Sequence, residues 1–306
     1  MQIPRVSVCV ITYNHELYIG DCILSVLNQA VNFKFEIIVG DDCSTDSTSL
    51  IIEDYRFRFP SIIKYISQPV RSYGPLNYEA VHAAATAEYV AHVDGDDLLL
   101  PNKLQKQVDF LDDNPNISLL WHRVRLFNGV IAETHPPLSA KYLDKKISQS
   151  DLVLYGPFGA HSSTMYRKTN YYLRDTCYPG NDWFISVQLI GDSYALMMSD
   201  VLACWRVTPN GISSGLSANY YNRLQLTNCQ TEILSIYPLY RPIISLRALF
   251  VFFWDLSNLK YYSYLSIIVF FKCHSFPSFR KLGMLLHFFR SSRLPKPFRE
   301  PLIKTL

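Results

Sequence analysis

The chain has 306 residues, enough for one large domain or for one domain with an appended segment. A chain of this length can bury a hydrophobic core large enough to be stable without disulfides or a structural metal. A formal net charge of +3 is too small to indicate a nucleic-acid-binding protein. The seven cysteines are scattered without CxxC or Cys/His ligand spacing, and the chain does not start with a cationic and then apolar leader, so we expect a reducing cytosolic compartment and no zinc site.

Predicted strands and helices alternate through the first 120 residues. The β-branched run at 5–12 predicts a strand, and the apolar spacing that follows predicts a helix over 15–29. Further strand–helix pairs are expected at 35–42 with 49–59, 62–68 with 77–87, and 88–97 with 104–114, before another strand at 117–121. This alternation favours right-handed crossovers and a mostly parallel sheet covered on both faces.

The second half of the chain changes character twice. Loop-like segments at 155–163 and 177–183 interrupt the alternation, as expected of a binding region built from loops. From Asn219 onward the pattern is helical, and 272–306 holds eight Lys or Arg against one acid. We therefore predict an α/β domain at 1–218 and a helical, basic and aromatic segment at 219–306.

Two interpretations of this C-terminal segment are open. It can pack on the first domain as a helical subdomain with a solvated cationic face, or it can associate peripherally with an anionic membrane surface, the interpretation that we favour. The apolar run at 261–271 is too short to cross a bilayer, which takes roughly 18 residues or more.

Three polar clusters follow predicted strands, at 12–14, 41–46 and 94–97. Because the carboxyl ends of parallel strands meet at one edge of a sheet, we expect the clusters to line a common crevice, where ligands bind in open α/β sheets. Turns and helix N-caps explain part of the pattern, since Asp46 or Ser47 can cap the helix that follows.

The cluster at 94–97 is harder to explain by capping alone. Asp94, Asp96 and Asp97 place three carboxylates within four residues, which repel one another and are costly to bury. Mg²⁺ or Mn²⁺ prefers such oxygen ligands and completes its shell with phosphate oxygens and water. The cluster therefore predicts a divalent cation that holds a diphosphate.

Three stretches resemble the family 2 glycosyltransferases with the GT-A fold: "VSVCVITYNHELYIGDCILSVLNQ", "IIVGDDCSTDST" and "YVAHVDGDD". The resemblance covers roughly residues 5 to 215, with the three motifs in order. It implies an α/β fold with a Rossmann-like, mostly parallel sheet flanked by helices. It also implies that 1–218 is a GT-A catalytic domain, with a nucleotide-sugar-binding half at 1–115 and an acceptor-binding half at 116–218.

The resemblance implies nucleotide-binding roles at the first two clusters. It places Tyr13 against the nucleobase, with Thr12 and Asn14 near the nucleoside. Asp42 would accept a hydrogen bond from a pyrimidine ring N–H, which uracil and thymine have at N3 and cytosine lacks. A UDP-sugar is therefore the expected donor, and a dTDP-sugar is the alternative.

At the third cluster, the resemblance implies that Asp94 approaches the ribose and that Asp96 coordinates Mn²⁺ or Mg²⁺. In the second half, "CWRVTPNGIS" at 204–213 resembles a family element in which Arg206 would contact the diphosphate. This chain has Thr208 where the family often has His, so Thr208 is not assigned to the site.

Further residues in the second half are candidates for the acceptor side. "GNDW" at 180–183 matches the region of the family's general base, so Asp182 is expected to take the proton of the attacking hydroxyl; it can also cap the helix that follows. His161 and Trp183 are candidates for acceptor binding. A loop histidine is more often an ordinary hydrogen-bonding residue, and a tryptophan is more often part of the core.

These features together predict an inverting, metal-dependent glycosyltransferase. It would move a sugar to a hydroxyl of a glycan or lipid-linked oligosaccharide in surface polysaccharide biosynthesis, in the cytoplasm or at the inner face of the cell membrane. The alternatives are a nucleotidyltransferase, which lacks support because no glycine-rich basic signature follows the first strand, and a catalytically silent nucleotide-sugar-binding or scaffold protein. A Rossmann dehydrogenase is excluded, since no GxGxxG follows the first strand.

Overall fold

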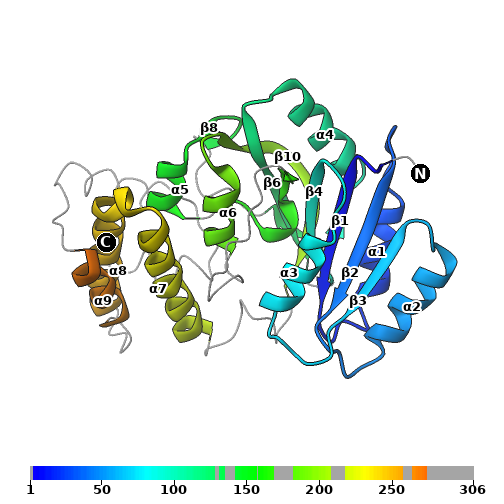
Figure 1. Cartoon of the computed structure of the whole chain (residues 1–306), viewed down its shortest axis with the longest axis horizontal. Helices are drawn as coiled ribbons and strands as arrows, with labels where there is room; N and C mark the ends of the chain where they lie inside the picture. The colour runs from blue at the N-terminus through cyan, green and yellow to red at the C-terminus, as the bar shows by residue number, and fades with distance from the viewer. Residues whose placement is uncertain are drawn as a thin grey trace.

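A twisted β-sheet flanked by helices forms the centre of the protein in the computed structural model (Figure 1). The structure describes residues 3–127, 131–134, 142–156, 158–168, 182–207, 218–257 and 264–273. Within these ranges the strands are β1 (Val6–Thr12), β2 (Phe35–Asp41), β3 (Ile63–Ser67), β4 (Tyr89–Asp94), β5 (Leu98–Leu99), β6 (Ile117–Phe127), β7 (Ile131–Thr134), β8 (Lys146–Ile147), β9 (Met165–Arg167) and β10 (Tyr194–Arg206).

The sheet is mostly parallel, as predicted. Its strands lie in the order β3-β2-β1-β4-β9-β6-β10-β5, with β7 beside β6 and β8 beside β10. Strands β3, β2, β1 and β4 run parallel to one another, and β6 runs parallel to β10. Strand β9 is antiparallel to both β4 and β6, so it joins two parallel groups into one sheet.

Helices cover both faces of the sheet. They are α1 (Ile19–Leu27), α2 (Thr48–Arg58), α3 (Pro75–Ala83), α4 (Lys103–Asp113), α5 (Gln149–Tyr155), α6 (Asp182–Ile190), α7 (Ala218–Ile236), α8 (Arg241–Ser257) and α9 (Tyr264–Cys273). Successive side chains of β1 point to opposite faces of the sheet, and each face has its own hydrophobic core. Val8 packs in a cluster with residues of α1, α2 and α4, whereas Cys9 packs in a cluster with residues of α3. Because both faces are buried, the central strands are mostly apolar, with few polar residues such as Ser7 of β1.

Two helix starts show how the loops at the sheet edge are set. The first helix begins at Ile19, later than the predicted residue 15, because the backbone at His15–Tyr18 forms a turn in which the N–H groups of Tyr18 and Ile19 donate to the carbonyl of His15. Helix α2 begins at Thr48, so Ser47 holds the N-cap position, although its side chain makes no capping hydrogen bond. Asp46, one residue earlier, accepts the N–H of Thr48 at Oδ1 over 3.0 Å.

The described C-terminal helices pack on the rest of the protein. Figure 1 shows α7, α8 and α9 grouped beside α5 and α6, at the opposite end from β3. Arg247 of α8 donates to the carbonyl of Leu154 over 2.8 Å, and Tyr240 donates to Gln149 over 2.8 Å. Among the described residues no helix combines the length and the apolar character needed to cross a bilayer. Residues 274–306, which carry most of the basic tail, lie outside the described ranges, so their membrane association stays a prediction. Residues 208–217 also lie outside these ranges, and the domain boundary near 218 stays a prediction too.

Candidate functional site

The three polar clusters meet at one edge of the sheet. In the register of the parallel strands, Thr12 lies beside Asp41, and Ile11 lies beside Asp94. The N–H of Asp42 donates to the carbonyl of Thr12 over 3.0 Å, and the N–H of Gly95 donates to that of Ile11 over 2.8 Å. A Cβ at Gly95 would lie 2.7 Å from Thr12 Cβ, so only glycine permits this approach. The predicted convergence is therefore confirmed.

Asn14 and Thr12 shape the first loop of this edge. Asn14 has a φ of 52°, donates its N–H to Ser44 Oγ over 2.9 Å and accepts the N–H of Thr45 at 2.8 Å. Thr12 is buried, with Oγ1 3.0 Å from His15 Nδ1. Asn14 thus ties the loop after β1 to the loop after β2. Contacts of either residue with a nucleoside stay predictions.

The Asp42 carboxylate accepts hydrogen bonds from residues 72–74, a segment that no sequence motif indicated. Its Oδ1 accepts from the N–H and Oγ of Ser72 over 2.8 and 2.6 Å, and its Oδ2 accepts from the N–H of Gly74 over 2.9 Å. Next to this segment, the Arg71 guanidinium lies 3.7 Å from the centre of the Tyr13 ring. Oδ2 accepts one of these bonds and retains a lone pair for another donor. Arg71 escaped the sequence argument because an arginine in a loop carries no positional signal of its own.

The three acids after β4 lie in three different environments. Asp97 is buried: its Oδ1 accepts the N–H of Arg206 over 2.8 Å, and its Oδ2 accepts the hydroxyl of Ser162 over 2.5 Å. Burial, followed by the charges of Asp94 and Asp96, raises the pKa of Asp97 well above its usual value. Asp97 therefore ties together distant parts of the chain and offers little to a ligand.

Asp94 and Asp96 retain the oxygens that a cation could use. Oδ1 of Asp94 lies 3.1 Å from His92 Nε2 and 3.5 Å from His161 Nδ1, while Oδ2 takes part in neither contact. Burial, with the charge of Asp94 adding to it, raises the pKa of Asp96, so a cation here would relieve repulsion between the carboxylates. Hard carboxylate oxygens on one turn suit Mg²⁺ or Mn²⁺.

His161 brings the acceptor-side acid next to the donor-side acids. Its Nδ1 lies 3.5 Å from Asp94 Oδ1 and 3.6 Å from Asp182 Oδ1. Burial alone lowers the pKa of His161, but the charges of Asp182 and Asp94 outweigh it and raise the pKa to about 9. His161 is therefore a cation at neutral pH, placed between two carboxylates.

Asp182 is the first residue of α6, and half of its side-chain surface reaches solvent. The protein around it still raises its pKa through desolvation, and His161 offsets part of that rise. A half-exposed carboxylate with a raised pKa suits general-base chemistry.

Arg206 lies at the end of β10, against the acidic turn. Its Nε donates to the carbonyl of Asp96 over 2.8 Å, and its guanidinium lies 4.4 Å from the centre of the Tyr18 ring. The Arg206 guanidinium is thus fixed beside the predicted metal site. Contact of Arg206 with a diphosphate stays a prediction.

The family model for glycosyl transferase family 2 matches residues 7–171, which contain all three strand-end clusters. The chain belongs to glycosyltransferase family 2. An uncharacterized relative from Mycobacterium tuberculosis is 32% identical over 213 residues, covering 67% of this chain and 60% of that protein. The minor teichoic acid biosynthesis protein GgaA of Bacillus subtilis is 31% identical over 118 residues, covering 37% of this chain and 26% of GgaA. The family 2 chain thus spans less than two thirds of these relatives.

Solved structures show the same fold. TarS 1–349 of S. aureus, in complex with UDP, superposes with a TM-score of 0.54 at 19% identity, covering 88% of this chain and 90% of that one. The mannosyltransferase PcManGT of Pyrobaculum calidifontis, in complex with GDP-Man and Mn²⁺, gives a TM-score of 0.55 at 15% identity, covering 97% and 78%. At these identities the likeness shows the GT-A fold of family 2 and nothing finer.

Trp183 does not line the site of this family 2 protein. Its side chain is 2% exposed, and its Nε1 donates to the carbonyl of Leu152 over 2.7 Å. The Arg247 guanidinium lies 4.4 Å from its ring centre. Because the indole is enclosed between α5 and α8, it has no free face for a sugar. This corrects the prediction that Trp183 stacks on the acceptor.

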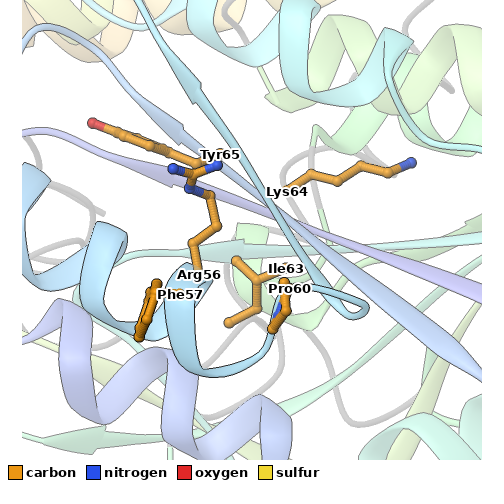
Figure 2. A pocket seen from close by; sticks show the side chains of 6 residues that line it. All are labelled: Arg56, Phe57, Pro60, Ile63, Lys64 and Tyr65. Carbon is orange, nitrogen blue, oxygen red and sulfur yellow. The ribbon is translucent and has the colours of Figure 1, made fainter.

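A surface cavity of about 530 Å³ lies elsewhere on the molecule. Figure 2 shows its lining: Arg56, Phe57, Pro60, Ile63, Lys64 and Tyr65. These residues come from the end of α2, from β3 at one edge of the sheet, and, for Pro60, from the segment that joins them. None of them belongs to the predicted site.

Proposed function

We propose that the protein is an inverting glycosyltransferase that moves a sugar from a nucleoside diphosphate sugar to an acceptor hydroxyl. One observation carries the proposal. His161 Nδ1 lies within 3.6 Å of both Asp94, at the end of β4, and Asp182, at the start of α6. A donor-side acid and an acceptor-side acid therefore lie in one place, as a transfer between two bound substrates requires.

The proposed donor is a UDP-sugar, with a dTDP-sugar as the alternative. The proposal rests on the Asp42 carboxylate, which can accept the N3–H of uracil or thymine, with Tyr13 beside it for stacking. The UDP bound in TarS, a protein of the same fold, is consistent with this choice. Thr12 and Asn14 would frame the nucleoside, and Asp94 would accept from the ribose.

The proposed cofactor is Mn²⁺ or Mg²⁺. Asp96 would hold it, with Oδ2 of Asp94 within the same turn, and the complex of PcManGT with GDP-Man and Mn²⁺ offers a precedent in a protein of this fold. When bound, the cation would neutralise charge on the departing diphosphate. Arg206 would add a second, permanent positive charge on the same side.

The proposed chemistry uses Asp182 as the general base. Its carboxylate takes the proton of the acceptor hydroxyl while that oxygen bonds to the anomeric carbon. The bond from the anomeric carbon to the diphosphate oxygen breaks, and the nucleoside diphosphate leaves with the electron pair. Attack opposite to the leaving group inverts the configuration. The His161 side chain lies beside Asp182 and is 16% exposed. From there its imidazole would donate a hydrogen bond to the bound acceptor substrate.

The proposed acceptor is a hydroxyl of a glycan or lipid-linked oligosaccharide in surface polysaccharide biosynthesis. GgaA, a relative named for minor teichoic acid biosynthesis, supports this class. In this proposal residues 1–115 bind the donor, 116–218 bind the acceptor, and 219–306 hold the enzyme at the inner face of the cell membrane.

Calorimetric titration of UDP, dTDP, CDP and GDP, each with and without Mn²⁺, tests the donor site. We expect UDP or dTDP to bind only with Mn²⁺, and Asp96→Ala to remove the effect of the metal. Asp54→Ala serves as the matched control, because it removes an exposed carboxylate on α2 that pairs only with Arg58 in the described structure. Binding of none of the nucleotides would favour the alternative, a catalytically silent scaffold of the same fold.

A further inference from the structure

A chain of buried polar side chains leads from Asp94 into the core. It runs through His92 of β4 and His82 of α3 to Tyr166 of β9, all of which are at most 1% exposed. Nε2 of His92 lies 3.1 Å from Asp94 Oδ1, Nε2 of His82 lies 2.9 Å from His92 Nδ1, and the Tyr166 hydroxyl lies 2.7 Å from His82 Nδ1. The ring of Tyr78 stacks on that of His82 at 3.8 Å and fixes its plane.

The carboxylate at one end determines where each hydrogen of this chain lies. An ionised Asp94 can only accept, so His92 carries its hydrogen on Nε2. In a neutral imidazole the other nitrogen is then an acceptor, so His82 must donate to it from its own Nε2. Nδ1 of His82 is left as an acceptor for the Tyr166 O–H. All three hydrogen bonds therefore point the same way, toward Asp94.

Burial supports the neutral state of both histidines. Desolvation, with the charges of His92 and His161 adding to it, lowers the pKa of His82 well below its usual value. Desolvation, followed by the charge of His161, lowers the pKa of His92 to about 4. Aligned hydrogen bonds in a medium of low dielectric constant polarise one another, so each bond strengthens the next.

The same residues could be considered as metal ligands, but their geometry opposes it. His92, Asp94 and His161 each place one ligand atom within 4.8 Å of the others. However, the two imidazole rings stack at 3.5 Å with an angle of 22° between their planes. Nitrogen lone pairs lie in the ring planes, so in stacked rings they run side by side and do not converge on one ion. A metal on Nε2 would also displace the hydrogen that Asp94 accepts.

We propose that His92, His82 and Tyr166 are positioning residues for Asp94. Their hydrogen bonds hold Oδ1 and leave Oδ2 turned to the crevice, where it meets the donor. The inference rests on the proposed function in one respect only, namely that Asp94 faces a nucleotide. The arrangement of hydrogens is independent of it.

NMR of the full chain labelled with ¹⁵N-histidine tests the arrangement directly. We expect two histidines in the Nε2–H form at pH 7, one lost in His92→Gln and the other shifted in Tyr166→Phe. An Nδ1–H form of either residue would overturn the proposal. Neither result depends on nucleotide binding.

UDP titration in the presence of Mn²⁺ tests the consequence. His92→Leu removes the donor to Asp94 and is expected to weaken binding at least ~10-fold, because hydrogen bonds to charged groups are stronger than neutral ones. His92→Gln should stay within about threefold of the wild type, since its amide can donate from the same place. Equal losses in both variants would mean that His92 only fills space, which would overturn the positioning role.

Tyr166→Phe tests the far end of this series of hydrogen bonds. It also keeps the proposal testable if His92→Leu does not fold. We expect an affinity loss of about two- to threefold, because polarisation passes on only part of a hydrogen bond. Tyr89→Phe is the matched control: it also removes a buried tyrosine hydroxyl, but one that donates to Asp112 instead of His82. If Tyr166→Phe and wild type bound UDP with equal affinity, the positioning role of this series of hydrogen bonds would be overturned. If wild type bound no UDP, the proposed function would fail, and the NMR result would still decide the arrangement.

Discussion

Raising the pH should destabilise this protein by removing the charge of His161. The imidazolium lies between Asp94 and Asp182, at 3.5 and 3.6 Å, and its side chain is only 16% exposed. His161→Gln removes the charge and keeps an amide that can hydrogen-bond. The variant should therefore be less stable than the wild type at low pH and similar to it at high pH.

The size of the effect follows from the pKa of His161. Folding raises this pKa from 6.5 to about 9, against the lowering effect of burial, because two carboxylates face the ring. Each pKa unit corresponds to about 1.4 kcal/mol, so the charge contributes roughly 3 kcal/mol. A group whose pKa is raised by folding gives its full contribution below the unfolded value of 6.5. That contribution is lost as the pH rises through about 9.

Urea unfolding of wild type and His161→Gln between pH 5.5 and 10, without metal or nucleotide, measures this contribution. Groups that do not interact with His161 titrate alike in both proteins and cancel in the difference between their free energies of unfolding. Asp182 is the exception, because His161 lowers its pKa, so its titration in the variant belongs to the same ion-pair effect. We expect that difference to fall from roughly 3 kcal/mol to near zero, with its midpoint above pH 7. Parallel stability curves for the two proteins would show that His161 is neutral in the folded state and would refute the reasoning.

Three further changes probe the site and its supports. Asp182→Asn should leave UDP affinity unchanged and lower transfer about 10²- to 10⁴-fold in a single-turnover assay, and transfer at the normal rate would exclude Asp182 as the base. Trp183→Ala should lower the free energy of unfolding by about 3–5 kcal/mol in urea, whereas unchanged stability with weaker acceptor binding would restore the stacking role. Gly95→Ala should cost about 1–3 kcal/mol and weaken UDP binding, because its Cβ would meet Thr12 at 2.7 Å. The matched control Gly20→Ala, whose Cβ would have no neighbour closer than 3.7 Å, should cost no stability in the same measurement.

Much of the fold followed from local patterns. The apolar runs of β1, β2 and β4 predicted a parallel sheet buried on both faces, and helices α1 to α4 lie within or close to their expected ranges. The short antiparallel strand β9 was not predicted, because its three residues lie between two stretches that read as loops, at 155–163 and 177–183. Pairing with both β4 and β6 makes it a strand, and that pairing depends on segments far away in the chain.

The sequence by itself determined which side chains stand at the ends of β1, β2 and β4, because the period of a strand and the direction of a crossover are local rules. It could not determine what each polar group meets. Only the tertiary structure brought His161 between Asp94 and Asp182, set Arg206 against Asp96, and buried the indole of Trp183. These contacts join segments far apart in sequence, and their distances follow from how whole helices and strands pack.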